Sequence, residues 1–393
     1  MRRLKQIFIM LVLVLVVLVT FNWGRISRLM AVVTMFDEDK IVSNFSHMDR
    51  AFEHAPLLVG SATALPQAPQ NLPETFSFQG QAQSLQAWLE DSRYTALVVL
   101  KDGAITHESY AQGTGPDDTH ISWSVAKSFL SALFGILVED GSIPDLNAQV
   151  TDYVPALIGS AYEGVRIIDV LQMSSGVEFN EDYLDFWSDI NKMGRVLALG
   201  WSMDGFAAGI NRRTRTPGSA RQYTSIDTHV LSMVIRGATG RNVVDLMGEK
   251  LLTPIGLEGP AYYITDGNGV AFVLGGMNMR TRDYARFGLL FANQGRIGAR
   301  QLVPVAWVAT STANIAPADA TGDARGYGYQ WWLPPNAQPG EFFAIGIYGQ
   351  YIYIDQPAGV VIAINAADRG FRDEARDAMN RNIAMFRAIA AGL

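Results

Sequence analysis

Near the N-terminus, an apolar run extends from Ile7 to Phe21. It follows “MRRLKQ”, which contains three basic residues. The run is shorter than the roughly 20 residues of a typical membrane-spanning helix, and the “NWGRISRL” that follows offers no small-residue cleavage site. We therefore expect residues 1–23 to form an uncleaved signal-anchor, with Trp23 at the membrane interface; a cleaved signal peptide is the alternative. The positive-inside rule makes the N-terminus cytoplasmic, so the rest of the chain is expected outside the cytoplasm, in the periplasm.

Residues 24–80 show no sustained hydrophobic period. The first part, 24–60, is expected to be a short helical or irregular connector. The second part, “SATALPQAPQNLPETF” (61–76), contains three prolines and is typical of a linker. One folded domain is then expected over residues 81–393, beginning with the short amphipathic helix “SLQAWLEDS”.

Regular patterns follow within that domain. Two apolar runs in “TALVVLKDGAITHESY” flank Asp102-Gly103 and predict a β-hairpin. A helix is expected from about Ser124 to Asp140, with Gly141 as its C-terminal cap. Apolar residues lie on every side of this segment, which is typical of a buried helix.

The middle of the chain, about 142–260, has helical patterns such as “RIIDVLQM”, “SIDTHVLSMVIRGATG” and “NVVDLMGEKLLTPIG”. In the second of these, Ser225 is placed to cap the helix and Gly240 to end it. Strand patterns return in “YGYQWWL”, “EFFAIGIYGQYIYID” and “GVVIAINA”, before a closing helix from about Arg372. Strands at both ends of the domain predict an α+β fold, with one antiparallel sheet assembled from both termini and flanked by helices.

Composition narrows the possible functions. A hydrophobic content of 49% and a charged content of 18% fit a globular protein, and the net charge of −7 argues against a nucleic-acid partner. The chain has no cysteine, which excludes disulfides and thiolate metal sites. Its five histidines lack metal-ligand spacing and no glycine-rich phosphate loop is visible, so we expect neither a metal nor a cofactor.

The chemistry of the buried helix depends on the pair Ser124 and Lys127. Residues i and i+3 of a helix share a face, so the Ser124 hydroxyl would meet the Lys127 amine. A serine becomes a strong nucleophile when a neighbouring base takes its proton. Burial and the positive end of a helix both lower a lysine pKa from its usual ~10.4, so Lys127 could be that base. The backbone N–H of Ser124 would serve as one oxyanion donor. In the structural alternative, Ser124 caps the helix and Lys127 extends to solvent.

A second motif, Tyr223-Thr224-Ser225, lies where a loop meets the next helix. Tyr223 could place its hydroxyl at the mouth of a site, and Ser225 could hydrogen-bond the Lys127 amine. A phenol beside an ammonium is expected to have a lowered pKa and can shuttle protons. In the structural alternative, Tyr223 is a half-buried aromatic and Ser225 only a cap.

These motifs resemble those of serine hydrolases related to β-lactamase. The order “SVAK”, “LQMSSG”, “PGSARQYTS”, “GMNMRTRDYARFG”, “YGYQWW”, “IGIYGQ” spans about residues 90–390 and is most similar to class C enzymes, penicillin-binding esterases and 6-aminohexanoate-dimer hydrolases. The resemblance implies a β-lactamase/transpeptidase-like fold and no cofactor. It also implies that Ser124 is the nucleophile, Lys127 the base, and Tyr223 the group that relays the proton to the leaving group.

The third family motif is where this chain departs. Many relatives have Lys-Thr-Gly or His-x-Gly on the strand beside the site, whereas this chain has Ala344-Ile345-Gly346. The missing cation argues against penicillin-like substrates. Gly346 would leave room for substrate against the strand, and the Ile347 N–H would be the second oxyanion donor. This variant is most similar to the 6-aminohexanoate-dimer hydrolase branch.

The loop “SSGVEFNEDYLDFWSD” supports the same branch. Its Tyr183 falls about where those amidases place a tyrosine that hydrogen-bonds the scissile amide nitrogen. Trp187 and Trp201 could form walls of the substrate pocket, or could pack on the helical part of the molecule. The acidic residues of this loop could bind a substrate ammonium, although a solvated loop explains them equally well: Asp182, Asp185 and Asp189.

The sequence therefore predicts a membrane-anchored serine hydrolase that cleaves an amide or ester of a small substrate through an acyl-enzyme. One alternative is a penicillin-binding or D,D-peptidase-like protein that acts on peptidoglycan peptides. Another is a membrane-tethered binding domain without turnover. A Ser-His-Asp triad is a poorer explanation, because no catalytic aspartate pattern surrounds the histidines.

Overall fold

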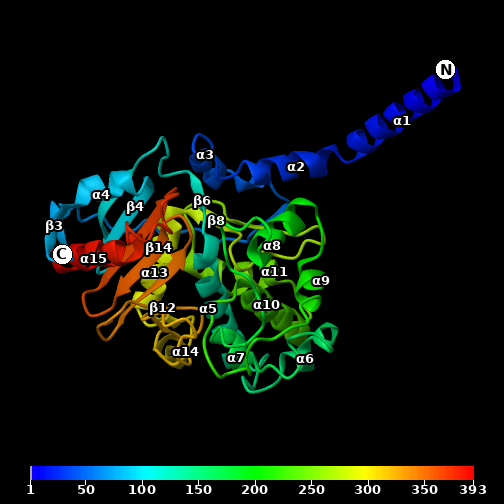
Figure 1. Cartoon of the computed structure of the whole chain (residues 1–393). Coiled ribbons are helices and arrows are strands. Elements are labelled where there is room, and N and C mark those ends of the chain that lie inside the picture. The colour runs from blue at the N-terminus through cyan, green and yellow to red at the C-terminus, as the bar shows by residue number, and fades with distance from the viewer. Residues whose placement is uncertain (1) are drawn as a thin grey trace.

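The computed structural model describes residues 2–393, and its central element is a seven-stranded antiparallel sheet (Figure 1). Strands from the two ends of the domain are neighbours in this sheet, because β15 pairs with β4. The predicted α+β class is confirmed. In sheet order the strands are β11 (Gly326–Tyr327), β12 (Trp332–Leu333), β13 (Glu341–Gly346), β14 (Gln350–Asp355), β15 (Val360–Ala366), β4 (Tyr94–Lys101) and β5 (Ala104–Tyr110).

The turn between β4 and β5 is the predicted hairpin. Asp102 and Gly103 both have positive φ, 49° and 83°, as a two-residue type I′ turn requires. Lys101 pairs with Ala104 directly across the turn. The turn sets the register at the tip of this hairpin, and a bulge at Val99 and Leu100 shifts it further along the strands.

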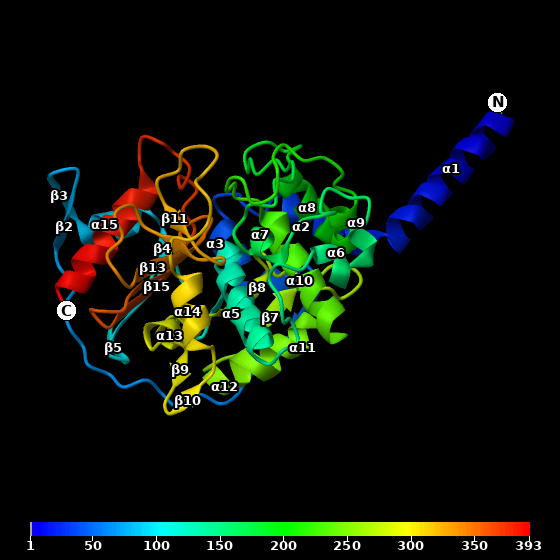
Figure 2. The same ribbon diagram turned by 90° about the horizontal axis from the view of Figure 1, so that it is seen from below.

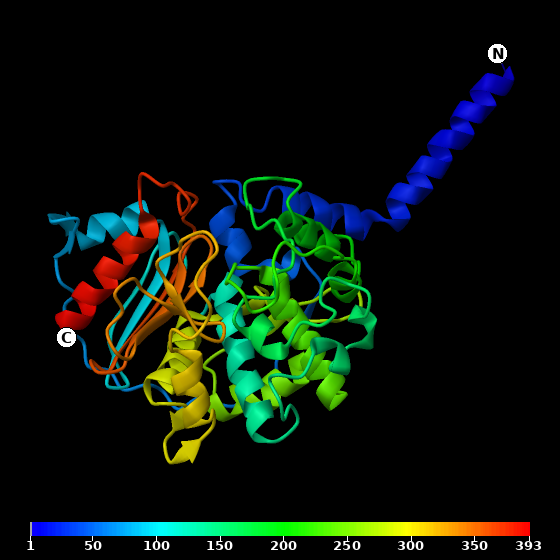
Figure 3. The same ribbon diagram turned by 60° about the horizontal axis from the view of Figure 1, so that its bottom comes forward.

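Helices cover both faces of the sheet, so its central strands are apolar on both sides. Val98 and Leu100 face the core that contains α13 (Thr281–Ala292), whereas Leu97 and Val99 face the core that contains α4 (Leu85–Asp91) and α15 (Ala378–Ala391). Figure 3 shows α15 and α13 on opposite sides of the sheet. The closing helix begins later than the expected Arg372, because Asp368 holds a turn through the Gly370 N–H (2.8 Å) and the Arg376 guanidinium (2.6 Å).

The helical half of the molecule packs around α5 (Ala126–Glu139), which lies between α13 and the helices of the middle of the chain (Figure 2). Its predicted apolar surface is buried along nearly its whole length. Residues 142–260, all of them described, form helices and no strand. They are α6 (Val150–Tyr153), α7 (Ile167–Leu171), α8 (Asp189–Ala198), α9 (Met203–Ala208), α10 (Ser225–Thr239), α11 (Val243–Met247) and α12 (Thr253–Ile255).

A second, four-stranded sheet was not predicted. Its strands have three or four residues each, too few for a recognisable alternation. This sheet holds the start of the turn Trp123–Val125, which contains Ser124, because the Ser122 N–H donates to the Met277 carbonyl at 2.8 Å. Its order is β1 (His54–Pro56), β7 (Tyr262–Ile264), β8 (Met277–Arg280) and β6 (Thr119–Ile121).

The segment 24–60, expected to be a connector, is instead part of the folded body. It contains α2 (Trp23–Val33), α3 (Ile41–Ser46) and β1, and the side chains of Met35 and Phe45 are almost fully buried in the main core. Only the preceding α1 (Arg2–Phe21) projects away from the body (Figure 1). The proline-containing stretch after residue 60 is extended, and the Ala68 N–H donates to the Ile105 carbonyl on β5 at 2.9 Å.

The aromatic contacts of this segment generate a stability prediction. Phe45 is 1% exposed and packs edge-on against Trp123 and Tyr348, at centroid distances of 5.5 and 5.4 Å. Phe45→Ala should lower the free energy of unfolding of the full-length protein by about 3–5 kcal/mol, because it leaves a cavity in a packed core. Leu58→Ala, at a residue 63% exposed, should change it by less than about 0.5 kcal/mol. Denaturant unfolding in micelles measures both; equal small effects would mean that 24–60 is a loosely attached connector.

Candidate active site

Ser124 and Lys127 meet at the start of α5, as their spacing predicts. Ser124 lies in a short 3₁₀ turn, Trp123–Val125, and Lys127 in the first turn of the α-helix. The Lys127 Nζ lies 2.9 Å from Ser124 Oγ and donates to the Leu274 carbonyl oxygen at 2.8 Å. The lysine therefore points along the helix toward the serine rather than to solvent.

Burial sets the protonation state of Lys127. Its side chain is 2% exposed and forms no ion pair with any residue in the range 2–393. Loss of hydration lowers its pKa to about 7, and the nearby negative charge of Glu181 opposes that shift. A large fraction of the amine is therefore neutral near pH 7, as a general base must be.

The backbone on both sides of the nucleophile is held in an unusual conformation. Trp123 and Tyr348 have φ values of 42° and 61°, in the left-handed region that costs non-glycine residues about 1–3 kcal/mol each. Their rings lie 6.4 Å apart and both contact Phe36 and Phe45 from the N-terminal segment. This aromatic cluster (Phe36, Phe45, Trp123 and Tyr348) packs under the two turns that carry Ser124 and Ile347.

Gly346 is required by packing within the protein, and it also lines the space beside Ser124, so the expected room for substrate stays a prediction. A Cβ at this position would lie 2.5 Å from the Ser122 carbonyl oxygen and 3.1 Å from the Trp123 Cβ. β13 can therefore approach the nucleophile turn only with glycine here. The Ser124 and Ile347 N–H groups donate no turn or loop hydrogen bond to any residue within 2–393, and both residues line the space around the nucleophile.

Tyr223 lies beside the pair but differs from expectation in its ionisation. The Lys127 Nζ faces the Tyr223 ring at 5.2 Å from the centroid. The pKa of Tyr223 is raised, not lowered, because burial and the negative charge of Glu181 outweigh the neighbouring hydroxyls of Ser124 and Ser225. With a pKa of about 7, Lys127 carries only part of a positive charge near neutral pH to counter this. Tyr223 is therefore a neutral phenol that can donate a proton.

The carboxylate of Glu181 was missed by the sequence analysis. It accepts hydrogen bonds from the Ser225 N–H (2.9 Å), from the Ser225 hydroxyl and from the Tyr183 hydroxyl (2.6 Å). The expected bond from Ser225 to Lys127 is thus replaced by one to Glu181. Ser225 is the first residue of α10 rather than its cap; Thr224 takes the cap position. Glu181 stands two residues before Tyr183, and in an extended segment that spacing puts both side chains on one side. This spacing could have identified Glu181 from the sequence as a neighbour of Tyr183.

Two spaces meet at Ser124. The first, here called the apolar cavity, has a volume of about 300 Å³, and its lining includes Val32, Met35, Phe36, Phe52, Phe272 and Leu274. The second, here called the polar cleft, has a volume of about 540 Å³, and its lining includes Glu181, Tyr223, Asp323, Arg325, Trp332 and Arg372. Ser124, Tyr183 and Ile347 line both.

The predicted tryptophan walls are wrong. Trp187 and Trp201 are 71% and 58% exposed and line neither space, because the loop turns their rings outward. Leu184 and Phe186 line the apolar cavity in their place. The acidic residues of the loop hold its turns: Asp182 and Asp185 accept from the N–H groups of Leu184 and Trp187, and Asp189 from that of Asn180.

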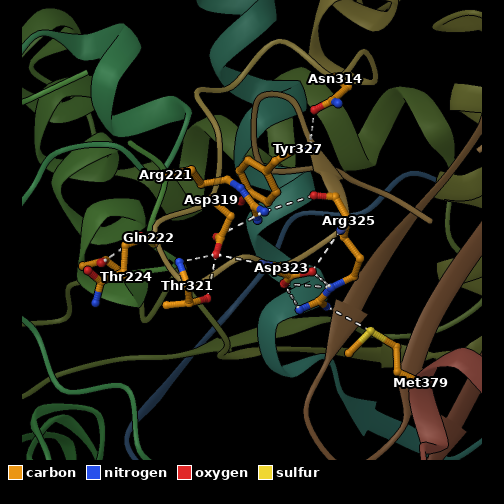
Figure 4. Close-up of polar contacts among 10 residues, drawn as sticks. All are labelled: Arg221, Gln222, Thr224, Asn314, Asp319, Thr321, Asp323, Arg325, Tyr327 and Met379. Atoms are coloured by element: carbon orange, nitrogen blue, oxygen red, sulfur yellow. Dashed lines mark hydrogen bonds and ion pairs between the residues drawn. The ribbon is translucent and has the colours of Figure 1, made fainter. Parts of the chain in front are cut away.

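One wall of the polar cleft is fixed by a buried ion pair, shown in Figure 4. Arg221 lies 3.2 Å from Asp319, with side chains 3% and 6% exposed, and also donates to the Arg325 carbonyl oxygen at 3.0 Å. Arg325 in turn pairs with Asp323. The loop from 319 to 325 is thereby tied to the segment that precedes Tyr223.

A histidine-based site is not supported. His229 lies 2.8 Å from Asp204, but neither residue lines the space around Ser124. Asp204 also pairs with Arg236, which is the pattern of a structural ion network. The lysine is the base that the geometry brings to the serine.

Comparison with known proteins identifies the family of this chain. The β-lactamase family model matches residues 90–385, and the chain belongs to that family; it is a serine hydrolase. It is 31% identical over 290 residues to the 6-aminohexanoate-dimer hydrolase of Paenarthrobacter ureafaciens, covering 71% of this chain and 74% of that protein.

Solved structures give the same result. A Bacillus anthracis protein that carries the 6-aminohexanoate-dimer hydrolase family name superposes with a TM-score of 0.80 at 25% identity, over 91% of this chain and 95% of its own. A D-stereospecific amidohydrolase from Streptomyces sp. shares the fold, with a TM-score of 0.57 at 19% identity over 75% and 95% of the two chains. The resemblance inferred from the motifs is confirmed.

The effect of the Glu181 charge on the pKa of Lys127 predicts how activity depends on pH. Because Lys127 has a pKa of about 7, kcat/KM for a short ester should fall as the pH drops through 7 and the amine becomes protonated. Glu181→Gln removes a charge that raises this pKa, so the midpoint should move to lower pH. Asp182→Asn removes a charge from the same loop and should leave the midpoint in place. An unchanged midpoint in the Glu181 variant would exclude this electrostatic coupling.

The ion pair of the cleft wall predicts a stability effect. Arg221→Met leaves the buried Asp319 carboxylate unpaired and should lower the free energy of unfolding by about 3–5 kcal/mol. Arg212→Met is the matched control, because Arg212 pairs with Glu178 at the surface, with 76% and 41% of the side chains exposed; it should cost less than about 1 kcal/mol. Similar losses in both variants in denaturant unfolding would contradict a structural role for Arg221.

Proposed function

We propose that this protein hydrolyses an amide or ester bond of a small substrate through an acyl-enzyme on Ser124, with Lys127 as the general base. One observation carries the proposal: the buried Lys127 amine, with a pKa lowered to about 7, lies 2.9 Å from the Ser124 hydroxyl. A serine beside a neutral amine is an activated nucleophile. A Lys127 that extended to solvent would have argued for the structural alternative.

In the proposed acylation, Ser124 Oγ attacks the carbonyl carbon while its proton passes to Lys127 Nζ. The Ser124 and Ile347 N–H groups stabilise the resulting oxyanion. The bond to the leaving nitrogen or oxygen then breaks as Tyr223 donates its proton to that atom, and Lys127 returns a proton to Tyr223. Water attacks the acyl-enzyme in the reverse sense and restores the free serine.

A linear amide or ester fits the site better than a penicillin. No cation stands at Ala344-Ile345-Gly346, and Ile345 and Gly346 line the polar cleft there. Tyr183 lies at the junction of the two spaces. Its hydroxyl donates to Glu181, so in the proposed complex its oxygen accepts from the N–H of the scissile amide. The name of the Paenarthrobacter ureafaciens relative also favours a linear amide.

A peptidase-like activity is the second candidate, because Arg372 supplies a cation to the polar cleft from another element. Its guanidinium lies 4.7 Å from the centroid of the Tyr183 ring. A carboxylate-bearing peptide could bind there. Covalent labelling by a fluorescent penicillin would favour this candidate over a linear-amide hydrolase.

We also propose that α1 anchors the enzyme in a membrane with the hydrolase body outside the cytoplasm. The segment Arg3–Phe21 is long and apolar enough to span a bilayer, and none of it is buried in the body. Its 19 residues extend about 28 Å as a helix, close to the ~30 Å of a hydrocarbon core.

Labelling with a fluorophosphonate probe tests the mechanism. The probe should modify Ser124, and Ser124→Ala should abolish labelling. Lys127→Met keeps the volume and apolar surroundings of the buried side chain, so the protein should fold, but loss of the base should lower kcat/KM for a short ester roughly 10²- to 10⁴-fold. Lys250→Met, at a lysine paired with Asp140 on the surface, should have no effect. Full activity of a folded Lys127 variant would exclude lysine as the base.

A further inference from the structure

The apolar cavity is built partly from the segment that follows the proposed membrane anchor. α2 begins two residues after α1 ends, and two residues span at most about 7 Å of chain. The start of α2 therefore lies at the bilayer surface if α1 spans the membrane. It is fixed to the body there, because Arg28 Nε donates to the Ala198 carbonyl oxygen at the end of α8 at 3.3 Å.

Apolar groups of this segment face the nucleophile across the cavity. Val32, Met35 and Phe52 line the apolar cavity, and so does Ser124. Three polar side chains in the lining make hydrogen bonds within the protein. Asn191 donates to the carbonyls of Tyr183 and Asp185, Arg195 donates to that of Phe186, and the Ser225 hydroxyl donates to Glu181. The cavity therefore offers its occupant an apolar surface.

The mouth of the cavity is also apolar and exposed. Its lining residues Val33, Leu184 and Phe186 are 63%, 81% and 53% exposed. Trp23 and Met30, exposed by 62% each, share one helical face with Val33, because their spacings are seven and three residues. Several exposed apolar side chains close in sequence to a membrane-spanning helix are typical of a surface that contacts lipid.

We propose that the apolar cavity binds the aliphatic or aromatic acyl chain of an amphiphilic amide or ester, which enters from the bilayer between α2 and the loop 182–187. This inference rests on the proposed function and on the membrane anchor. It assigns a substrate class, a membrane-partitioned acyl compound, in place of a freely soluble one.

The acyl side is assigned to the cavity because of where the proton donor lies. Tyr223, which donates to the leaving group in the proposed mechanism, lines the polar cleft and not the apolar cavity. The leaving group therefore occupies the cleft beside Arg325 and Arg372. A cavity of about 300 Å³ holds about ten groups the size of a water molecule, so chains of about eight to ten carbons should fill it.

A chain-length series on the full-length protein in lipid nanodiscs tests this assignment. With p-nitrophenyl esters from acetyl to dodecanoyl, kcat/KM should rise about fourfold per added methylene and level off near eight to ten carbons. In the reversed series, acetate esters of longer alcohols, the rise should be absent. A flat acyl series, or a rise in the reversed series only, would overturn the assignment.

Gly194 allows the cavity itself to be altered without risk to the fold. It is a residue of α8 that lines the cavity, and a Cβ there would meet nothing within 4 Å. Gly194→Leu should fill the space and lower the octanoyl-to-acetyl ratio of kcat/KM at least tenfold. Gly194→Ala, which shares the gain in helix propensity, should lower the ratio much less. Gly205→Leu, on an exposed face of α9 outside the cavity lining, should leave it unchanged.

Failure of this inference differs from failure of the proposed function. If Ser124 is labelled and acetyl esters are cleaved while the acyl series is flat, the hydrolase mechanism stands and the cavity assignment is wrong. If Ser124 is not labelled and no ester is cleaved, the mechanism itself is wrong. An unchanged ratio in Gly194→Leu, with the wild-type series rising, would place the acyl chain elsewhere and overturn the assignment.

Discussion

The rest of the site depends on the environment of the buried Lys127 amine. It contacts the Ser124 hydroxyl and the Leu274 carbonyl but no carboxylate. Removing a charged amine from water is unfavourable, so burial lowers its pKa to about 7. A carboxylate in direct contact would hold the amine protonated and stop it from acting as a base. The fold meets this requirement by burying most of α5, Lys127 included, while Ser124 in the turn just before the helix lines the cleft.

The membrane-proximal segment and the nucleophile turn form one packed unit. Trp123 and Tyr348 hold left-handed backbone conformations next to Ser124 and Ile347, and such conformations persist when the surroundings over-determine them. Phe36 and Phe45 supply part of that packing. The chain between anchor and catalytic body therefore supports the proposed oxyanion site and also lines the apolar cavity, which explains why it folds rather than acting as a flexible tether.

Sequence reasoning succeeded where the signal is local. The β4–β5 turn, the apolar surface of α5 and the Ser124–Lys127 spacing each depend on neighbouring residues, and each was predicted correctly. It failed where tertiary contacts decide. The strands of the second sheet are too short to show a period, the pairing of Glu181 with Ser225 joins residues 44 positions apart, and the outward direction of Trp187 follows from loop turns. The raised pKa of Tyr223 was also missed, because burial and the negative charge of Glu181 both raise it.

Glu181 carries a negative charge that acts on Lys127 without forming an ion pair with it. Its carboxylate is bound by neutral donors, the Ser225 N–H, the Ser225 hydroxyl and the Tyr183 hydroxyl, and it forms no ion pair with any residue in the range 2–393. In the proposed mechanism Lys127 becomes an ammonium only as the oxyanion forms, and a fixed negative charge nearby favours that state. Direct contact would have raised the resting pKa of Lys127 too far for the amine to serve as a base. Held one layer away by Ser225, the same charge instead stabilises the ammonium that develops during acylation, which is the kind of preorganised electrostatic support that lowers a barrier.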